Sequence, residues 1–87
     1  MNVYKIYLGC PHEGTKACEI VQAYFDGFTV YRAKGYWQGK SEETTVFEIV
    51  TDSEMDIRSM AERLRYGFNQ HCVMVVKQNV DVSFVEG

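Results

Sequence analysis

Aromatic and basic side chains gather in the middle of the sequence, in the segment Tyr-Arg-Ala-Lys-Gly-Tyr-Trp at residues 31–37. In a strand, alternate side chains point to opposite faces, so Arg32, Lys34 and Tyr36 share one side and Tyr31 and Trp37 share the other. Aromatic faces stack on flat rings, and cations pair with oxyanions. The segment therefore suits a small anionic ligand with a flat ring, such as a nucleotide. The predicted ligand-binding residues are Tyr31, Arg32, Lys34, Tyr36, Trp37, Lys40, Glu42 and Arg65.

The same cluster also permits a purely structural interpretation. A twisted hairpin at the edge of a dimer would use Trp37 for interface packing, because aromatic residues are common in ordinary interfaces. Its charges would then protect the strand edge from unwanted pairing. Gly35 leaves room for another group to approach the backbone closely. The sequence leaves both interpretations open.

Cysteine and histidine form a second cluster, with Cys10 and His12 in one segment and His71 and Cys72 in another. If the first and last strands are antiparallel neighbours, these residues could converge, and two cysteines with two histidines are a zinc-binding set. The spacing is not that of a usual zinc finger, and adjacent residues of a strand point in opposite directions. We expect no metal, no cofactor and reduced thiols.

Acid–base catalysis has little support in the sequence. His12 and His71 are the only side chains whose unperturbed pKa lies near neutrality. The chain contains no nucleophile elbow, phosphate loop, metal-binding His-x-x-x-His or Ser/His/Asp arrangement. Small dimeric domains can be enzymes without a cofactor, using one His or Tyr in a pocket, but this possibility rests on analogy of fold.

Hydrophobic periodicity predicts the elements that must position these residues. The predicted strands are 3–8, 28–37, 44–51 and 72–76, with a turn at 39–40, and the predicted helices are 15–25 and about 54–66. Alternating apolar residues at Val80, Val82 and Phe84 predict a terminal extension after a bulge or turn at residues 78–79. The order predicts a single α+β, ferredoxin-like βαββαβ domain over residues 1–87. Its four-stranded antiparallel sheet carries two helices on one face.

Composition limits the partners of this domain. Hydrophobic residues make up 46% of the 87 residues, and an uncovered sheet face with large side chains predicts a homodimer or a higher oligomer. A net charge of −3 argues against general nucleic-acid binding. No stretch is long enough to span a membrane, and the N-terminus has no signal-peptide pattern, so we expect a cytoplasmic protein.

A family resemblance covers nearly the whole chain. The segments Gly27-Phe28-Thr29-Val30, Ala33-Lys34-Gly35-Tyr36-Trp37 and Val82-Ser83-Phe84 resemble a family of short, uncharacterised bacterial proteins with the pattern G-L-T-V, A-x-G-Q-W-R and V-S-F. Gln38 stands where that family has Arg, and the helix lacks its Trp. The resemblance implies a ferredoxin-like fold and no particular activity. The short loops would suit a phage-encoded member.

Three functions follow from these observations. The first is a non-enzymatic oligomeric module that binds a small anionic ligand, and sequesters a nucleotide or a nucleotide-derived signal. The second is an enzyme without a cofactor, of the dimeric α+β barrel kind. The third is a protein-interaction module, such as an inhibitor of a host protein, with Trp37 as its hot spot.

Overall fold

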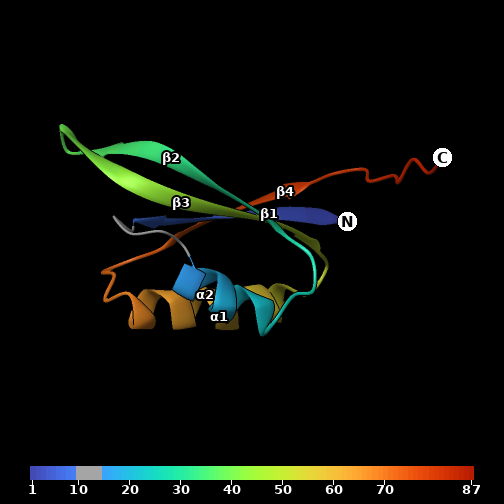
Figure 1. Cartoon of the computed structure of the whole chain (residues 1–87), viewed down its shortest axis with the longest axis horizontal. Coiled ribbons are helices and arrows are strands. Elements are labelled where there is room, and N and C mark those ends of the chain that lie inside the picture. Colours follow the sequence, from blue (N-terminus) through green and yellow to red (C-terminus); the bar gives the residue numbers. More distant parts are fainter. Residues whose placement is uncertain (10–14) are drawn as a thin grey trace.

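The structure is a computed structural model of the chain, and it describes residues 1–9 and 15–87 (Figure 1). The elements are β1 (Asn2–Gly9), α1 (Thr15–Gln22), β2 (Thr29–Trp37), β3 (Lys40–Thr51), α2 (Glu54–Gly67) and β4 (Met74–Asn79). The βαββαβ order is therefore confirmed.

The strands form one four-stranded sheet in the order β2-β3-β1-β4, and every neighbouring pair is antiparallel. Both helices lie on one face of this sheet (Figure 1). This is the predicted ferredoxin-like fold. The strand order places β2 and β4 at the two edges, on opposite sides of the molecule.

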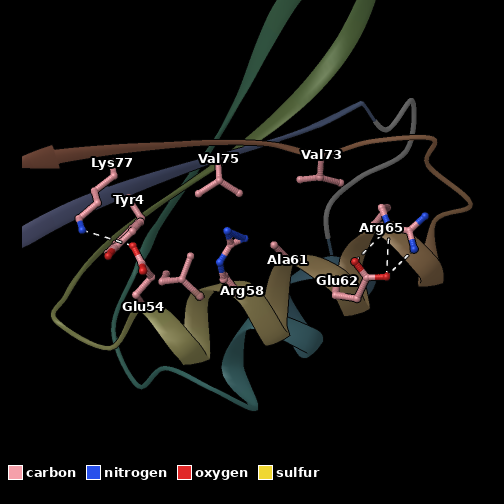
Figure 2. Close-up of a pocket in the computed structure, with 10 residues that line it drawn as sticks. Tyr4, Glu54, Arg58, Ala61, Glu62, Arg65, Val73, Val75 and Lys77 are labelled. Carbon is pink, nitrogen blue, oxygen red and sulfur yellow. Dashed lines mark hydrogen bonds and ion pairs between the residues drawn. The ribbon is translucent and has the colours of Figure 1, made fainter.

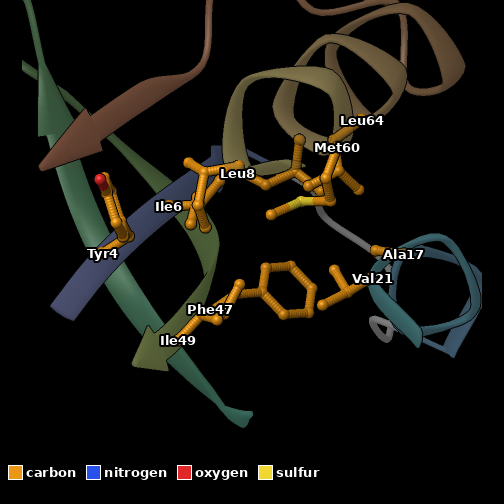
Figure 3. Close-up of a cluster of buried hydrophobic side chains, with 10 residues drawn as sticks. Tyr4, Ile6, Leu8, Ala17, Val21, Phe47, Ile49, Met60 and Leu64 are labelled. Atoms are coloured by element: carbon orange, nitrogen blue, oxygen red, sulfur yellow. The ribbon is translucent and has the colours of Figure 1, made fainter. Parts of the chain in front are cut away.

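The core lies between the helices and the two central strands (Figure 3). Alternate residues of β1 and β3 point toward the helices, as the period of a strand requires. Each fully buried aliphatic side chain contributes roughly 1.5–3 kcal/mol, so this layer supplies most of the stabilisation. The buried cluster consists of Tyr4, Ile6, Leu8, Ala17, Val21, Phe47, Ile49, Ile57, Met60 and Leu64.

The helix ends show how local signals set the boundaries. The first helix ends at Gln22 and not at Phe25, because the amide of Ala23 bonds the carbonyl of Ile20 and the chain tightens into a turn. The second helix follows Ser53, whose hydroxyl bonds Asp56 at 2.9 Å instead of capping the backbone. The acidic residues of its first turn, Glu54 and Asp56, interact favourably with the positive end of the helix dipole and stabilise the start of the helix.

Two predicted strand boundaries are wrong. The third strand begins at Lys40 and not at residue 44, because the hairpin pairs all the way to its turn. The last strand covers Met74–Asn79 and not residues 72–76, because it pairs with Asn2–Tyr7 of β1. Hence no turn occurs at residues 78–79. Beyond Val80, whose amide bonds the carbonyl of Met1, the chain forms no strand.

The sheet face away from the helices is the open face. One row of directly paired side chains crosses it, from Tyr31 through Val46 and Tyr7 to Met74. Tyr31 and Met74 are exposed at the two edges of this row, while Val46 is buried between its neighbours. The described residues include no helix long and apolar enough to cross a membrane.

Candidate functional site

The β2–β3 hairpin extends beyond the rest of the sheet (Figure 1). Its turn is Gln38–Gly39, not residues 39–40, and both residues have positive φ, 52° and 80°. Two consecutive left-handed residues are typical of the tight hairpin turn whose twist matches the strands. As a result Trp37 lies directly opposite Lys40, and the two form the last residue pair before the turn.

The tip of the hairpin carries the most accessible aromatic rings of the predicted site. Tyr36 is 73% exposed and Trp37 is 70% exposed, on opposite faces of the ribbon. Lys34 shares the face of Tyr36, and Lys40 is the cross-strand neighbour of Trp37. Each ring therefore shares its face of the ribbon with a lysine.

Arg32 is bound to the sheet rather than held out to solvent. Its Nη1 donates a hydrogen bond to the Thr45 hydroxyl at 2.7 Å, and its Nη2 lies 3.9 Å from a carboxylate oxygen of Glu43. Thr45 is fully buried, so this bond anchors the guanidinium at the base of the hairpin. A ligand would have to share Arg32 with these partners.

Gly35 has a structural reason for lacking a side chain. A Cβ at this position would lie 2.8 Å from the hydroxyl oxygen of Thr44, which is buried on the neighbouring strand. The close approach expected from the sequence is therefore made by Thr44. The space over Gly35 is filled by the protein itself.

Glu42 lies opposite Gly35 but its carboxylate reaches the end of β1. A Cβ on Gly9 would lie 3.1 Å from its Oε1 and 3.3 Å from Oε1 of Gln70. The carboxylate thus lies beside Gly9 and Gln70 and away from the turn. It is poorly placed to contact a ligand at the tip.

Arg65 does not join the hairpin within one chain. Its guanidinium forms an ion pair with Glu62, one turn earlier on α2, and hydrogen-bonds both carboxylate oxygens (Figure 2). The hydrogen bond from Arg65 lowers the pKa of Glu62, and Glu62 in turn raises the pKa of Arg65. This pair lines a groove beside β4, at the sheet edge opposite β2.

That groove, between α2 and β4, is the feature that sequence reasoning missed. It has a volume of about 330 Å³ and contains acidic, basic and apolar side chains (Figure 2). The side chains come from β1, α2 and the last strand, so no local motif brings them together. The lining residues are Tyr4, Glu54, Ile57, Arg58, Ala61, Glu62, Arg65, Val73, Val75 and Lys77.

On the open face, Tyr31 and Glu48 form an acid–base pair. Hydrogen bonding to the Glu48 carboxylate raises the pKa of Tyr31 because it favours the neutral phenol, and burial and the negative charge of Glu48 act in the same direction. Tyr7 contributes a smaller effect in the same direction. Tyr31 therefore releases its proton less readily than an ordinary tyrosine.

The proposed convergence of cysteines and histidines is tested only in part. Strands β1 and β4 are antiparallel neighbours, as expected. Cys10 and His12 lie outside the described residues, and His71 and Cys72 are exposed. Within residues 1–9 and 15–87, no group of three or more candidate metal ligands occurs. The absence of a metal stays a prediction.

The arrangement of sheet and helices defines this chain as an α+β protein of the ferredoxin-like class. No protein-family model and no curated protein sequence matches it, so membership in the bacterial family resembled above stays a prediction.

Solved structures of the same fold cover most of the chain. The PII-like protein CutA from Nostoc sp. PCC 7120 in apo form is 20% identical, with a TM-score of 0.61, over 93% of this chain and 82% of its own. CPII bound to ADP, AMP and acetate, from Thiomonas intermedia K12, is 16% identical, with a TM-score of 0.63, over 95% and 88%. A phage SAM lyase in apo state is 16% identical, with a TM-score of 0.56, over 88% and 78%. At these identities the similarity shows a shared fold.

Proposed function

We propose that this protein is a non-enzymatic, oligomeric module that binds a small anionic ligand of the nucleotide class at the tip of the β2–β3 hairpin. The observation that carries the proposal is the pairing of rings with cations there. Trp37 lies directly opposite Lys40, and Tyr36 shares a face with Lys34. A nucleobase would stack on a ring while its phosphate pairs with the neighbouring ammonium group.

The hairpin tip alone offers only one wall of such a site. Rings that are 70% or more exposed leave the far side of a stacked base in water. Binding sites are normally concave and bury most of the ligand. We infer that a second copy of the chain supplies the opposite wall, so that ligand binding requires the oligomer.

Exposed apolar surface supports self-association. Edge strand β4 is exposed along its whole length, and Met74, Val75 and Val76 are each at least 38% exposed. The terminal segment 80–87 extends away from the sheet and carries Phe84 at 86% exposure (Figure 1). Apolar residues gathered in this way usually mark an interaction site.

The shared fold lends the proposal further support. CPII from Thiomonas intermedia K12 has been solved bound to ADP and AMP, so one protein of this fold binds adenine nucleotides. For this chain we propose sequestration of such a ligand, in the cytoplasm, by a phage-encoded protein that belongs to the short bacterial family described above.

The chain contains a single tryptophan, which makes the test specific to the hairpin. The protein is titrated with AMP, with adenosine and with ribose 5-phosphate while Trp37 fluorescence is measured. We expect AMP to quench it at the lowest concentration, because only AMP has both the ring and the phosphate. Light scattering of the free protein should give a multiple of the chain mass. Fluorescence unchanged by AMP, ADP, GMP and UMP, or a monomer mass at micromolar concentration, contradicts the proposal.

A second candidate, an enzyme without a cofactor, is favoured by the Tyr31–Glu48 pair on the open face. A hydroxyl beside a carboxylate offers a hydrogen-bond donor and a proton acceptor side by side, and a phage SAM lyase shares the fold. Recovery of the ligand after incubation and denaturation separates the candidates, because a binding module returns AMP or SAM unchanged. A product that disappears in the Tyr31→Phe variant identifies the enzyme. An interaction module would return no bound nucleotide.

A further inference from the structure

The groove between α2 and β4 is built from both charged and apolar side chains, on the helix side of the sheet (Figure 2). Val73 and Val75 form its upper wall, and Ala61 lies across from them on α2. Its volume of about 330 Å³ lies at the lower end of the range of small-molecule sites.

The Tyr4 hydroxyl is the unusual group at this groove. The tyrosine is only 2% exposed, and within the described residues its hydroxyl is a buried polar atom without a hydrogen-bond partner. The pKa of Lys77 is raised, mainly by the Glu54 carboxylate and to a smaller extent by the Tyr4 hydroxyl beside it. An ammonium group can only donate to the Tyr4 oxygen, so the hydroxyl hydrogen of Tyr4 has no acceptor among the described residues. Buried polar groups are nearly always partnered. This hydroxyl lies just beneath the groove surface, and a bound acceptor that displaced the Lys77 side chain would satisfy it.

Arg58 is the cation at the centre of the groove. It projects from α2 toward β4 and is flanked by two ion pairs, Glu54 with Lys77 at one end and Glu62 with Arg65 at the other (Figure 2). Among the described residues Arg58 itself forms no ion pair. Three cations and two carboxylates line the groove, so its balance is one positive charge.

We propose that this groove binds a small aliphatic monocarboxylate. The carboxylate would pair with the Arg58 guanidinium, whose planar donors match its geometry, and accept a hydrogen bond from Tyr4. The aliphatic body would lie against Val73 and Val75. A single excess positive charge balances a monoanion. A phosphate dianion would leave one negative charge unbalanced beside the carboxylates of Glu54 and Glu62. The site uses none of the hairpin residues and does not depend on the function proposed for the hairpin.

The probe is 3-methylbutanoate, with its neutral amide and inorganic phosphate as comparisons. Two-dimensional ¹H–¹⁵N and methyl ¹H–¹³C NMR spectra follow the Arg58 side chain and the methyl groups of Val73 and Val75. We expect all three to shift with 3-methylbutanoate, with a dissociation constant of about 1–10 mM for so small a ligand. The amide and phosphate should give much smaller shifts. Equal shifts with all three probes, or none at Arg58, overturn the proposal.

Three variants separate binding from folding. Arg58→Gln should weaken 3-methylbutanoate about tenfold or more, since it removes a charge-assisted hydrogen bond. Arg63→Gln is the matched control, because Arg63 lies on the same helix but stacks on Tyr24 at 5.8 Å. Tyr4→Phe should weaken binding while leaving the melting temperature unchanged or higher, because it removes a buried hydroxyl without a partner.

Two results would contradict the assignment. A lower melting temperature and unchanged binding in Tyr4→Phe would mean that the hydroxyl serves the fold. A change of oligomeric mass in Arg58→Gln, with no response of Arg58 to the probe, would mean that the groove is a subunit contact. Trp37→Ala should leave 3-methylbutanoate binding unchanged, so failure at the hairpin and failure at the groove are distinguishable.

Discussion

The two edges of the sheet carry similar side chains in different settings. Both β2 and β4 combine cations with an aromatic or apolar surface. At the β2 edge the hairpin extends past the helices, and its rings are exposed on both faces (Figure 1). At the β4 edge α2 runs alongside the strand, and the same kinds of groups line a groove (Figure 2).

The difference shows that chemistry alone does not make a complete site. The groove can contact a ligand from several sides, although the ion-paired side chains that line it are 39–63% exposed. A protruding ribbon needs a second surface to do the same. The ligand site proposed at the hairpin tip therefore requires a partner copy, whereas the site proposed in the groove is lined by residues of one chain.

The largest effect is expected where the hairpin is packed most tightly. In Gly35→Ala the new methyl group would lie 2.8 Å from Thr44 Oγ1, and Thr44 is a buried residue that cannot move freely. Overpacking of this kind costs about 1–3 kcal/mol. Thermal unfolding should show a lower melting temperature, by several degrees for a domain of this size.

Gly27→Ala is the control, because a Cβ there would meet nothing within 4 Å. The double variant Gly35→Ala, Thr44→Ala should recover part of the loss, since it removes the contacting hydroxyl. Equal melting temperatures for Gly35→Ala and Gly27→Ala would mean that the hairpin adjusts freely to the new methyl group. The tight packing of Gly35 against Thr44 would then not hold the hairpin tip in a fixed position.

An intermediate effect is expected on ligand affinity. Loss of the stacking face in Trp37→Ala should weaken AMP binding by about 1–3 kcal/mol, or roughly 5- to 150-fold. Arg32→Ala should act mainly on stability, by about 0.5–1.5 kcal/mol, because it removes the hydrogen bond to Thr45. Calorimetric titration and a sizing run of both variants provide the measurement.

Tyr66→Ala is the matched aromatic control, since Tyr66 is 83% exposed on α2 and away from the hairpin. If Trp37→Ala alters the oligomeric mass and leaves AMP affinity unchanged, the hairpin is a dimer edge and the ligand binds elsewhere. If Arg32→Ala weakens AMP as much as Trp37→Ala at unchanged stability, Arg32 contacts the ligand directly.

The hairpin could be found in the sequence because its residues are neighbours along the chain. Period-two alternation correctly places Arg32 with Lys34, and Tyr31 with Trp37, on opposite faces. The sequence did not show that Arg32 is bonded to Thr45, because that contact depends on cross-strand register. The sequence also did not show where the Arg65 side chain lies. Its ion pair with Glu62, three residues earlier on α2, directs it to the groove and away from the hairpin.

The groove could not be found in the same way. Tyr4, Arg58 and Lys77 are far apart in the sequence and meet only after the sheet and α2 have packed. Tyr4 matches its strand pattern as an ordinary core residue, and its hydroxyl becomes notable only once it is buried without a partner. The boundary of the last strand was wrong for a related reason, since pairing with β1 and not local propensity sets its length.

The smallest effects concern titration, and they distinguish the two edges by mechanism. Tyr31 at the β2 edge has a raised pKa because the adjacent Glu48 favours its neutral form. Lys77 at the β4 edge has a raised pKa because Glu54, 3.3 Å away, favours its charged form. In both cases the folded chain retains a proton that the unfolded chain releases. Stability should therefore fall as the pH rises through the folded pKa of each group.

Glu48→Gln isolates the contribution of the β2 edge. The amide carries no charge and leaves only a weaker hydrogen bond to Tyr31, so we expect the pKa of Tyr31 to fall part of the way toward its ordinary value of 10.0. NMR titration of ¹³C-labelled tyrosines measures this pKa, with the Tyr31 signal assigned by its loss in Tyr31→Phe.

Glu43→Gln, on the same strand but facing the other side of the sheet, is the control and should leave the pKa of Tyr31 unchanged. Tyr31 and Glu48 are not deeply buried, so added salt should reduce the pKa shift of Tyr31. A Tyr31 pKa that is the same in Glu48→Gln and the parent protein would mean that the carboxylate does not act on the tyrosine, and the second candidate function would lose its acid–base pair.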